Sequence, residues 1–104
     1  MPRWLPRVLK RIRALAAARR IQFTEKARGE LAQLDLGLDQ SDACDVLANL
    51  GRSDYAGRTI SQSTGEWMYV FKPEVAGMGY VKAILRARGC RVISFHEQGE
   101  EEDG

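Results

Sequence analysis

Histidine and cysteine are scarce in this sequence of 104 residues, which holds one histidine and two cysteines. One histidine cannot build a zinc site without unusual help from carboxylates, so we expect no metal. The cysteines, Cys44 and Cys90, lie in apolar patterns without a secretion signal, which predicts buried thiols in a reducing cytoplasm rather than a disulfide. No run of about 18 apolar residues occurs, so we expect no transmembrane helix. These scarcities favour a cytoplasmic protein.

Several common catalytic motifs are also absent. The sequence has no glycine-rich loop for nucleotide phosphates, no Cys/His spacing typical of a metal site and no serine nucleophile motif. We therefore expect no cofactor. The enzyme chemistry that remains is acid–base catalysis with cationic stabilisation.

Each end of the chain lacks charge of one sign. Residues 1–20 carry seven basic side chains and no acidic one, whereas residues 97–104 carry five acidic side chains and no basic one. A basic segment attracts phosphate backbones or an acidic protein partner, and a solvated helix face explains the same pattern. We expect a single domain over residues 1–97 and a disordered acidic tail over residues 98–104, which has too few apolar groups to pack.

Apolar periodicity predicts helices in the first half of the chain and strands in the second. The three-and-four spacing of a helix occurs over residues 5–18, 25–34 and from 41 or 42 to 50. β-Branched and aromatic residues between turn residues predict strands near residues 58–63, 66–72, 78–87 and 90–97. This order predicts an α+β fold, with three helices followed by a four-stranded antiparallel sheet.

The only histidine, His96, lies at the end of the last predicted strand. Three interpretations compete for it: a core residue, a surface residue or a catalytic group. A three-residue loop over residues 87–89 predicts that Tyr80 opposes His96 and that Lys82 opposes Ser94. The same loop predicts two further pairs, Arg86 with Cys90 and Ile84 with Val92. Side chains alternate along a strand, so a buried Ile93 and Phe95 leave the phenol, the amine and the imidazole together on the other face. Spacing alone leaves open whether this cluster is catalytic.

Five segments have the order and spacing of a known family. They read LGLD, CDVLANLGRSDY, GEWMYVFKP, GYVKAIL and VISFHE, within a likeness that runs from about Leu5 to Glu97. The most specific parts are Trp67 to Pro73, Gly77 to Lys82 and Ser94 to Glu97. In this order the segments resemble the MqsR family of bacterial type II toxins, in the RelE-like group of small RNA endonucleases.

The resemblance implies a RelE-like fold, with three helices on a twisted antiparallel sheet whose face carries the active site. It implies an mRNA interferase and an antitoxin partner, for which we expect a helix-turn-helix protein. The family's active-site tyrosine falls on Tyr80 and its C-terminal catalytic basic residue on His96. We expect Lys82 and Arg58 to hold the scissile phosphate. The expected RNA-binding residues are Lys72, Arg86, Glu66 and Gln62.

The chain departs from the family pattern at two positions. Gly57 stands where the family has a lysine, and Met68 stands where it has a glutamine; Arg58 and Glu66 are the candidate replacements. These departures keep a second hypothesis open, that of a weakened or inactive domain that only binds nucleic acid or protein. A nuclease that needs the ribosome is a further alternative.

Trp67, Tyr69 and Phe71 alternate along one predicted strand and therefore share a face. They fit the core of the sheet, or a surface on which the bases of single-stranded RNA stack.

Overall fold

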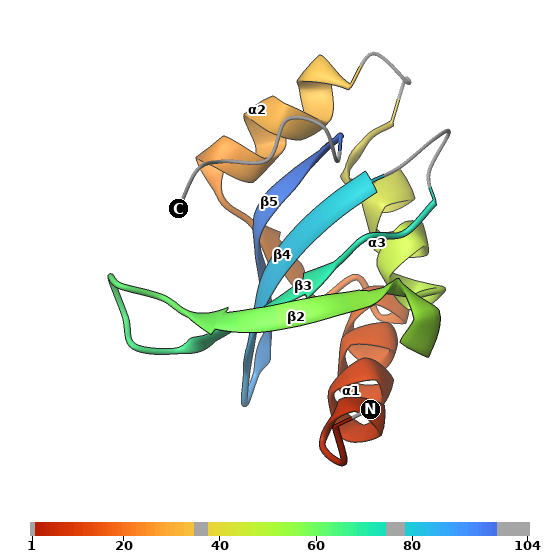
Figure 1. Cartoon of the computed structure of the whole chain (residues 1–104). Helices are drawn as coiled ribbons and strands as arrows, with labels where there is room; N and C mark the ends of the chain where they lie inside the picture. The colour runs from red at the N-terminus through yellow and green to blue at the C-terminus, as the bar shows by residue number, and fades with distance from the viewer. Residues whose placement is uncertain (1, 35–37, 75–78, 98–104) are drawn as a thin grey trace.

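A computed structural model describes residues 2–34, 38–74 and 79–97 of the chain, shown in Figure 1. The helices are α1 (Leu5–Ala17), α2 (Glu25–Gln33) and α3 (Gln40–Ala48), followed by the short 3-10 helix η1 (Arg52–Asp54). The strands are β1 (Ile21–Phe23), β2 (Tyr55–Ile60), β3 (Trp67–Phe71), β4 (Gly79–Arg86) and β5 (Gly89–Glu97). The predicted α+β class and the three helices are confirmed. The predicted acidic tail, residues 98–104, lies outside the described residues.

The sheet differs from the predicted four-stranded antiparallel meander. It has five strands in the order β1-β5-β4-β3-β2, and β1 runs parallel to β5. The strand that the prediction missed, β1, has only three residues between two helices. A segment of this length is too short to show the alternation by which a strand is recognised in a sequence. The sheet is therefore mixed.

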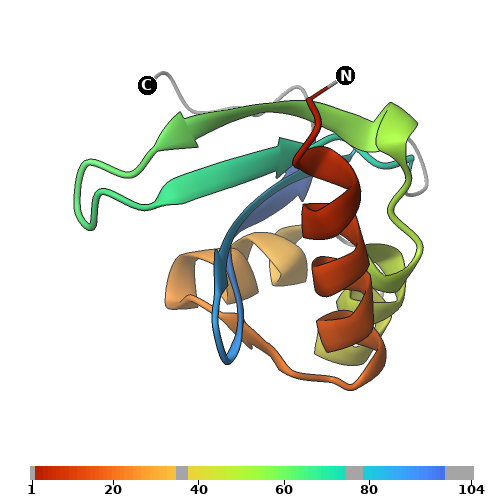
Figure 2. The ribbon, with the colours of Figure 1, turned by 90° about the horizontal axis from the view of Figure 1, so that it is seen from below.

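One face of the sheet carries the hydrophobic core. The apolar stripe of α1, including the fully buried Leu5 and Ile12, packs against buried strand residues such as Phe71, Val81 and Phe95. Figure 2 shows the three helices on the same side of the ribbon formed by β2, β3 and β4. None of the described helices packs on the opposite face, and we call it the open face.

The hairpin of β4 and β5 has the predicted register at one end only. Tyr80 pairs with His96 and Lys82 with Ser94, as predicted. Near the loop the prediction is wrong, because the turn has two residues, 87 and 88, instead of three. Arg86 therefore pairs with Gly89 instead of Cys90, and Ile84 pairs with Arg91 instead of Val92.

A β-bulge at Ile93 explains why the register is as predicted at one end of this hairpin and shifted by one residue at the other. Lys82 pairs with Ser94 and the next residue, Ala83, pairs with Val92, so Ile93 is the extra residue. A bulge shifts the alternation of side chains by one position. Val92 therefore lies in the core, where it is fully buried, although it was predicted to face away from it. Without the bulge, Phe95 and not His96 would oppose Tyr80.

Thr24 connects helix α2 to this bulge. Its hydroxyl oxygen accepts a hydrogen bond from the Ala27 backbone N–H (3.0 Å), which caps the helix, and donates to the Ile93 carbonyl (3.3 Å). The same side chain thus fixes the start of α2 and the irregular part of β5.

Replacement of Thr24 by alanine should destabilise the fold by about 1 kcal/mol, the usual cost of losing a helix cap. For a domain of this size we expect the melting temperature to fall by about 4–8 °C in a thermal denaturation experiment. Thr24→Ser keeps the hydroxyl and serves as the control. Equal melting temperatures for the alanine variant and the unsubstituted protein would show that the cap contributes nothing.

Candidate functional site

Tyr80 and His96 lie stacked on the open face, at the end of the β4–β5 hairpin. Their ring centroids are 4.7 Å apart and the rings are inclined by 15°. The predicted convergence of the phenol and the imidazole is therefore confirmed. His96 is, however, only 4% exposed, so its ring is almost fully shielded from solvent.

The hydrogen bonds of His96 differ between its two ring nitrogens. Nδ1 lies 2.6 Å from the carbonyl oxygen of Glu97. Because a carbonyl oxygen only accepts, Nδ1 carries the proton of this bond. Nε2 has no hydrogen-bond partner, and among the described residues it is the one buried side-chain nitrogen or oxygen in that position. In the neutral ring Nε2 therefore presents an unused lone pair, as a general base requires.

Helix α2 forms the wall beside the histidine. A small pocket of about 130 Å³ is lined by Glu30, Gln33, Leu34, His96 and Glu97. The carboxylate of Glu30 also accepts a hydrogen bond of 3.0 Å from the backbone N–H of Phe95. In the part of β5 that β1 does not reach, the backbone at the strand edge thus hydrogen-bonds to a helix side chain instead of to another strand. Glu30 was not among the predicted site residues, because nothing in a helical pattern marks which outer residue reaches a strand.

A second residue of α2 reaches the same part of β5. The ammonium of Lys26 donates a hydrogen bond of 3.2 Å to the hydroxyl of Ser94, the partner of Lys82 in the sheet. Ser94 is 1% exposed. Lys26 therefore brings a positive charge to the rim of the open face, and it too was not among the predicted site residues.

The structure places two predicted lysines near the stacked pair. The Lys82 ammonium lies 6.0 Å from the centre of the Tyr80 ring, on the same face of β4. Lys72 follows the last residue of β3, and continuing the β3–β4 pairing places it opposite Tyr80. The predicted grouping of Lys82 with the phenol agrees with this register, and Lys72, predicted only as an RNA contact, lies near it.

Arg58 lies on the other face of the sheet. It pairs with Tyr69, whose ring packs against the core, and its guanidinium lies between two indoles, 4.4 Å from the centre of Trp4 and 3.7 Å from that of Trp67. A guanidinium held over indole faces makes favourable cation–π contacts. The prediction that Arg58 and Lys82 share one phosphate is therefore not supported, because the sheet separates them.

Glu66 and Arg86 bind each other. Two hydrogen bonds of 3.0 and 2.8 Å join the guanidinium to the two carboxylate oxygens. The hydrogen bond to Arg86 lowers the pKa of the Glu66 carboxyl, and the same bond raises the pKa of Arg86. Gln62, the fourth predicted RNA contact, is exposed in the turn that joins β2 to β3. These three residues are not beside His96.

The aromatic row of β3 lies on the core face. Phe71 is fully buried and Tyr69 packs against the core, whereas Trp67 remains 41% exposed. The prediction of a core role is confirmed for Phe71 and Tyr69. This row does not offer a base-stacking surface beside His96.

Within residues 2–34, 38–74 and 79–97, no group of three or more histidine, cysteine, aspartate or glutamate side chains is placed to hold a metal ion. In the same part of the chain, no helix is long and apolar enough to cross a membrane.

A comparison with known protein families matches residues 6–97 to the family described as "Motility quorum-sensing regulator, toxin of MqsA". The chain belongs to this family. It is thus a toxin of a toxin–antitoxin system, and its family implies an antitoxin partner. No curated protein matches the sequence significantly. The resemblance seen in the sequence is confirmed, and the MqsR-family toxin carries its stacked tyrosine and histidine on the open face, at the edge next to α2.

The hydrogen bond between Nδ1 and Glu97 predicts the tautomer of the neutral imidazole. We expect the Nδ1–H form, with Nε2 unprotonated, in a long-range ¹⁵N–¹H correlation spectrum recorded where the ring is neutral. Since His96 is the only histidine, the signals need no further assignment. A neutral ring with its proton on Nε2 would contradict the arrangement described above.

Proposed function

We propose that this toxin is a metal-independent endoribonuclease that cleaves mRNA. The observation that supports it best is the unpartnered Nε2 of His96, held by the Glu97 carbonyl and the Tyr80 ring on the open face. In the cell, mRNA is available in the cytoplasm, where we place the protein.

The proposed reaction begins with attack of a 2′-hydroxyl on the adjacent phosphate. Nε2 of His96 accepts the proton of this hydroxyl as the bond from the 2′-oxygen to phosphorus forms. The bond from phosphorus to the 5′-oxygen then breaks, and the imidazolium donates its proton to that oxygen. The products are a 2′,3′-cyclic phosphate and a free 5′-hydroxyl. The hydrogen bond from Nδ1 to Glu97 persists in both charge states of the ring, which keeps Nε2 aimed at the substrate.

The neighbouring cations stabilise the charge on the phosphate. Lys82 and Lys72 lie on the same face as the stacked pair, and Lys26 reaches its rim through Ser94. Positive charges that are fixed before the reaction stabilise the pentacovalent phosphorane without reorganising. His96 is 4% exposed and lines the small pocket beside α2, and we propose this pocket as the route by which the phosphate reaches Nε2. Tyr80 orients the imidazole by stacking on it.

A weakened toxin that binds RNA without cutting it efficiently is the second candidate. Two observations favour it: Met68 stands in place of the family glutamine, and Arg58 lies on the opposite face from His96. The open face then has fewer polar groups around the phosphate than the resemblance implied. For either candidate we propose a helix-turn-helix antitoxin encoded beside the toxin as the partner that neutralises it.

Replacement of His96 by alanine should lower the rate of RNA cleavage by about 100- to 1000-fold, the usual effect of removing one catalytic group. The assay uses purified protein and naked RNA in the presence of a metal chelator. Lys10→Ala, an exposed change on α1, is the control and should cut at the normal rate. A loss of less than about threefold for His96→Ala would reject the catalytic role of His96.

Expression in bacteria separates the two candidates. Induction of the intact toxin without its antitoxin should stop growth, and His96→Ala should restore it. If the purified protein cuts no naked RNA but arrests growth through His96, the toxin needs the ribosome. If neither His96 nor RNA cleavage matters for growth, the protein acts as a binding module.

A further inference from the structure

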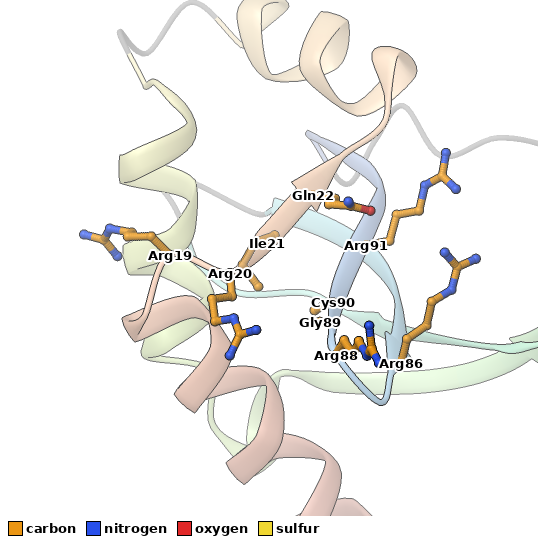
Figure 3. Close-up of a pocket in the computed structure, with 9 residues that line it drawn as sticks. All are labelled: Arg19, Arg20, Ile21, Gln22, Arg86, Arg88, Gly89, Cys90 and Arg91. Atoms are coloured by element: carbon orange, nitrogen blue, oxygen red, sulfur yellow. The ribbon is translucent and has the colours of Figure 1, made fainter.

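Five arginines surround an open pocket of about 390 Å³ at the loop end of the β4–β5 hairpin, shown in Figure 3. They come from two segments that are far apart in the sequence: the turn between α1 and β1, and the hairpin with its flanking strand residues. The arginines that line it are Arg19, Arg20, Arg86, Arg88 and Arg91. Within the described part of the chain, no acidic side chain lines this pocket.

Two of the five arginines already form an ion pair with a carboxylate of the protein. Arg19 forms an ion pair of 2.6 Å with Asp45, and in Figure 3 its side chain points away from the others. Arg86 is bound to Glu66. The other three guanidiniums make no hydrogen bond or ion pair with any of the described residues; they belong to Arg20, Arg88 and Arg91. Positive charges that form no ion pair within the fold remain available to attract an anion into this pocket.

The backbone builds this arrangement by specific means. Arg19 takes a left-handed conformation (φ 60°) at the end of α1, and the next N–H, that of Arg20, bonds back to the Leu15 carbonyl at 2.8 Å. This Schellman turn directs the chain into β1. A side chain added at Gly89 would lie 3.5 Å from the Arg20 carbonyl, so the turn and the hairpin are in contact. Arg11 of α1 also donates to the Ala87 carbonyl at the tip of the hairpin.

The pocket is continuous with the open face that carries His96. Arg91 pairs with Ile84 of β4 and with Gln22 of β1, which places Arg91 and Gln22 on that face. Arg91 and His96 are both on β5, five positions apart, or about 15 Å along the strand. A single strand of RNA with one phosphate at His96 could therefore reach this pocket within a few nucleotides.

From this geometry we infer that the pocket around Arg20, Arg88 and Arg91 binds backbone phosphates of the RNA strand that His96 cuts. The inference rests on the proposed function. It assigns to the pocket a positioning role that is independent of base sequence, since phosphate contacts fix the register of a nucleic acid without reading its bases. The planar guanidinium suits bidentate contacts with phosphate oxygens.

An acidic protein segment is the competing ligand, and the surroundings disfavour it. Protein interfaces usually contain an apolar or aromatic centre. The large exposed hydrophobic residues among the described part of the chain are Ile60 and Trp67, and neither lines this pocket. Cys90 at the pocket is 2% exposed, and burial raises the pKa of its thiol to about 12, so it stays a neutral part of the wall.

The test measures binding of a fluorescently labelled, fully 2′-O-methylated RNA, which cannot be cleaved, by anisotropy at several salt concentrations. The triple variant Arg20→Ala, Arg88→Ala, Arg91→Ala should bind at least about tenfold more weakly at moderate salt. The slope of log affinity against log salt should fall in magnitude by about 2, since each phosphate contact on a single strand contributes about 0.7. Its melting temperature should change little, because the removed side chains make no hydrogen bond or ion pair with the described residues.

The matched control removes the same charge elsewhere. Arg7, Arg28 and Arg52 are exposed and lie outside the pocket, and their triple alanine variant should keep most of the affinity and of the salt slope. Equal losses in both variants would overturn the inference, because the effect would then be one of net charge. Unchanged RNA binding by the pocket variant, with lost binding of polyglutamate, would assign the pocket to an acidic protein and overturn it as well.

The proposed function can fail separately from this inference. If the intact protein cuts no RNA, but the pocket variant alone loses affinity for the uncleavable strand, the catalytic proposal is wrong and the phosphate site stands. If the intact protein cuts RNA and both triple variants bind it normally, the catalytic proposal stands and the site is wrong.

Discussion

A single extra residue in β5, Ile93, decides which face of the sheet carries the histidine. With a two-residue turn and no bulge, alternation would bring Phe95 opposite Tyr80 and turn His96 toward the core. The bulge returns the His96 side chain to the same face as Tyr80. It lies where β1 ends, at the point where Thr24 and Glu30 hydrogen-bond to the edge of β5 in place of a strand. The chemistry proposed for this toxin therefore depends on a local backbone irregularity that the start of a helix holds in place.

The same region fixes the orientation of the imidazole but leaves one of its two ring nitrogens without a hydrogen bond. Nδ1 is bonded to the next residue's carbonyl and the ring is stacked on Tyr80, while Nε2 remains without a partner. Leaving a buried polar atom unbonded costs stability, roughly 1–3 kcal/mol. A protein that keeps such an atom at the edge of an uncovered sheet face keeps a group that can bind or accept a proton from a ligand. This cost is the physical reason to regard His96 as more than a core residue.

Sequence patterns predicted the parts of this fold that long, regular segments determine. The stripe of α1 and the alternation of β4 repeat often enough to be recognised, and the pairing of Tyr80 with His96 followed from them. The bulge and the three-residue strand β1 could not be predicted, because each involves too few residues to leave a pattern. The predicted pair was correct although the loop length was wrong, since the missing loop residue and the extra residue Ile93 compensate. The place of Arg58 between two indoles depends on contacts across the fold, which spacing along the chain does not encode.

The cations of this toxin fall into two groups according to their partners. Arg19, Arg58 and Arg86 are held by a carboxylate or by indole rings, so their charges serve the structure of the free protein. Arg20, Arg88 and Arg91 line one pocket at the end of the face that leads to His96, and their guanidiniums form no ion pair with the described residues. Charges already satisfied within the fold lose part of their attraction for a ligand, whereas unpaired charges keep it. RNA binding should therefore follow the unpaired cations instead of the number of basic residues, and an oligonucleotide should lie along β5 from the arginine pocket to the imidazole.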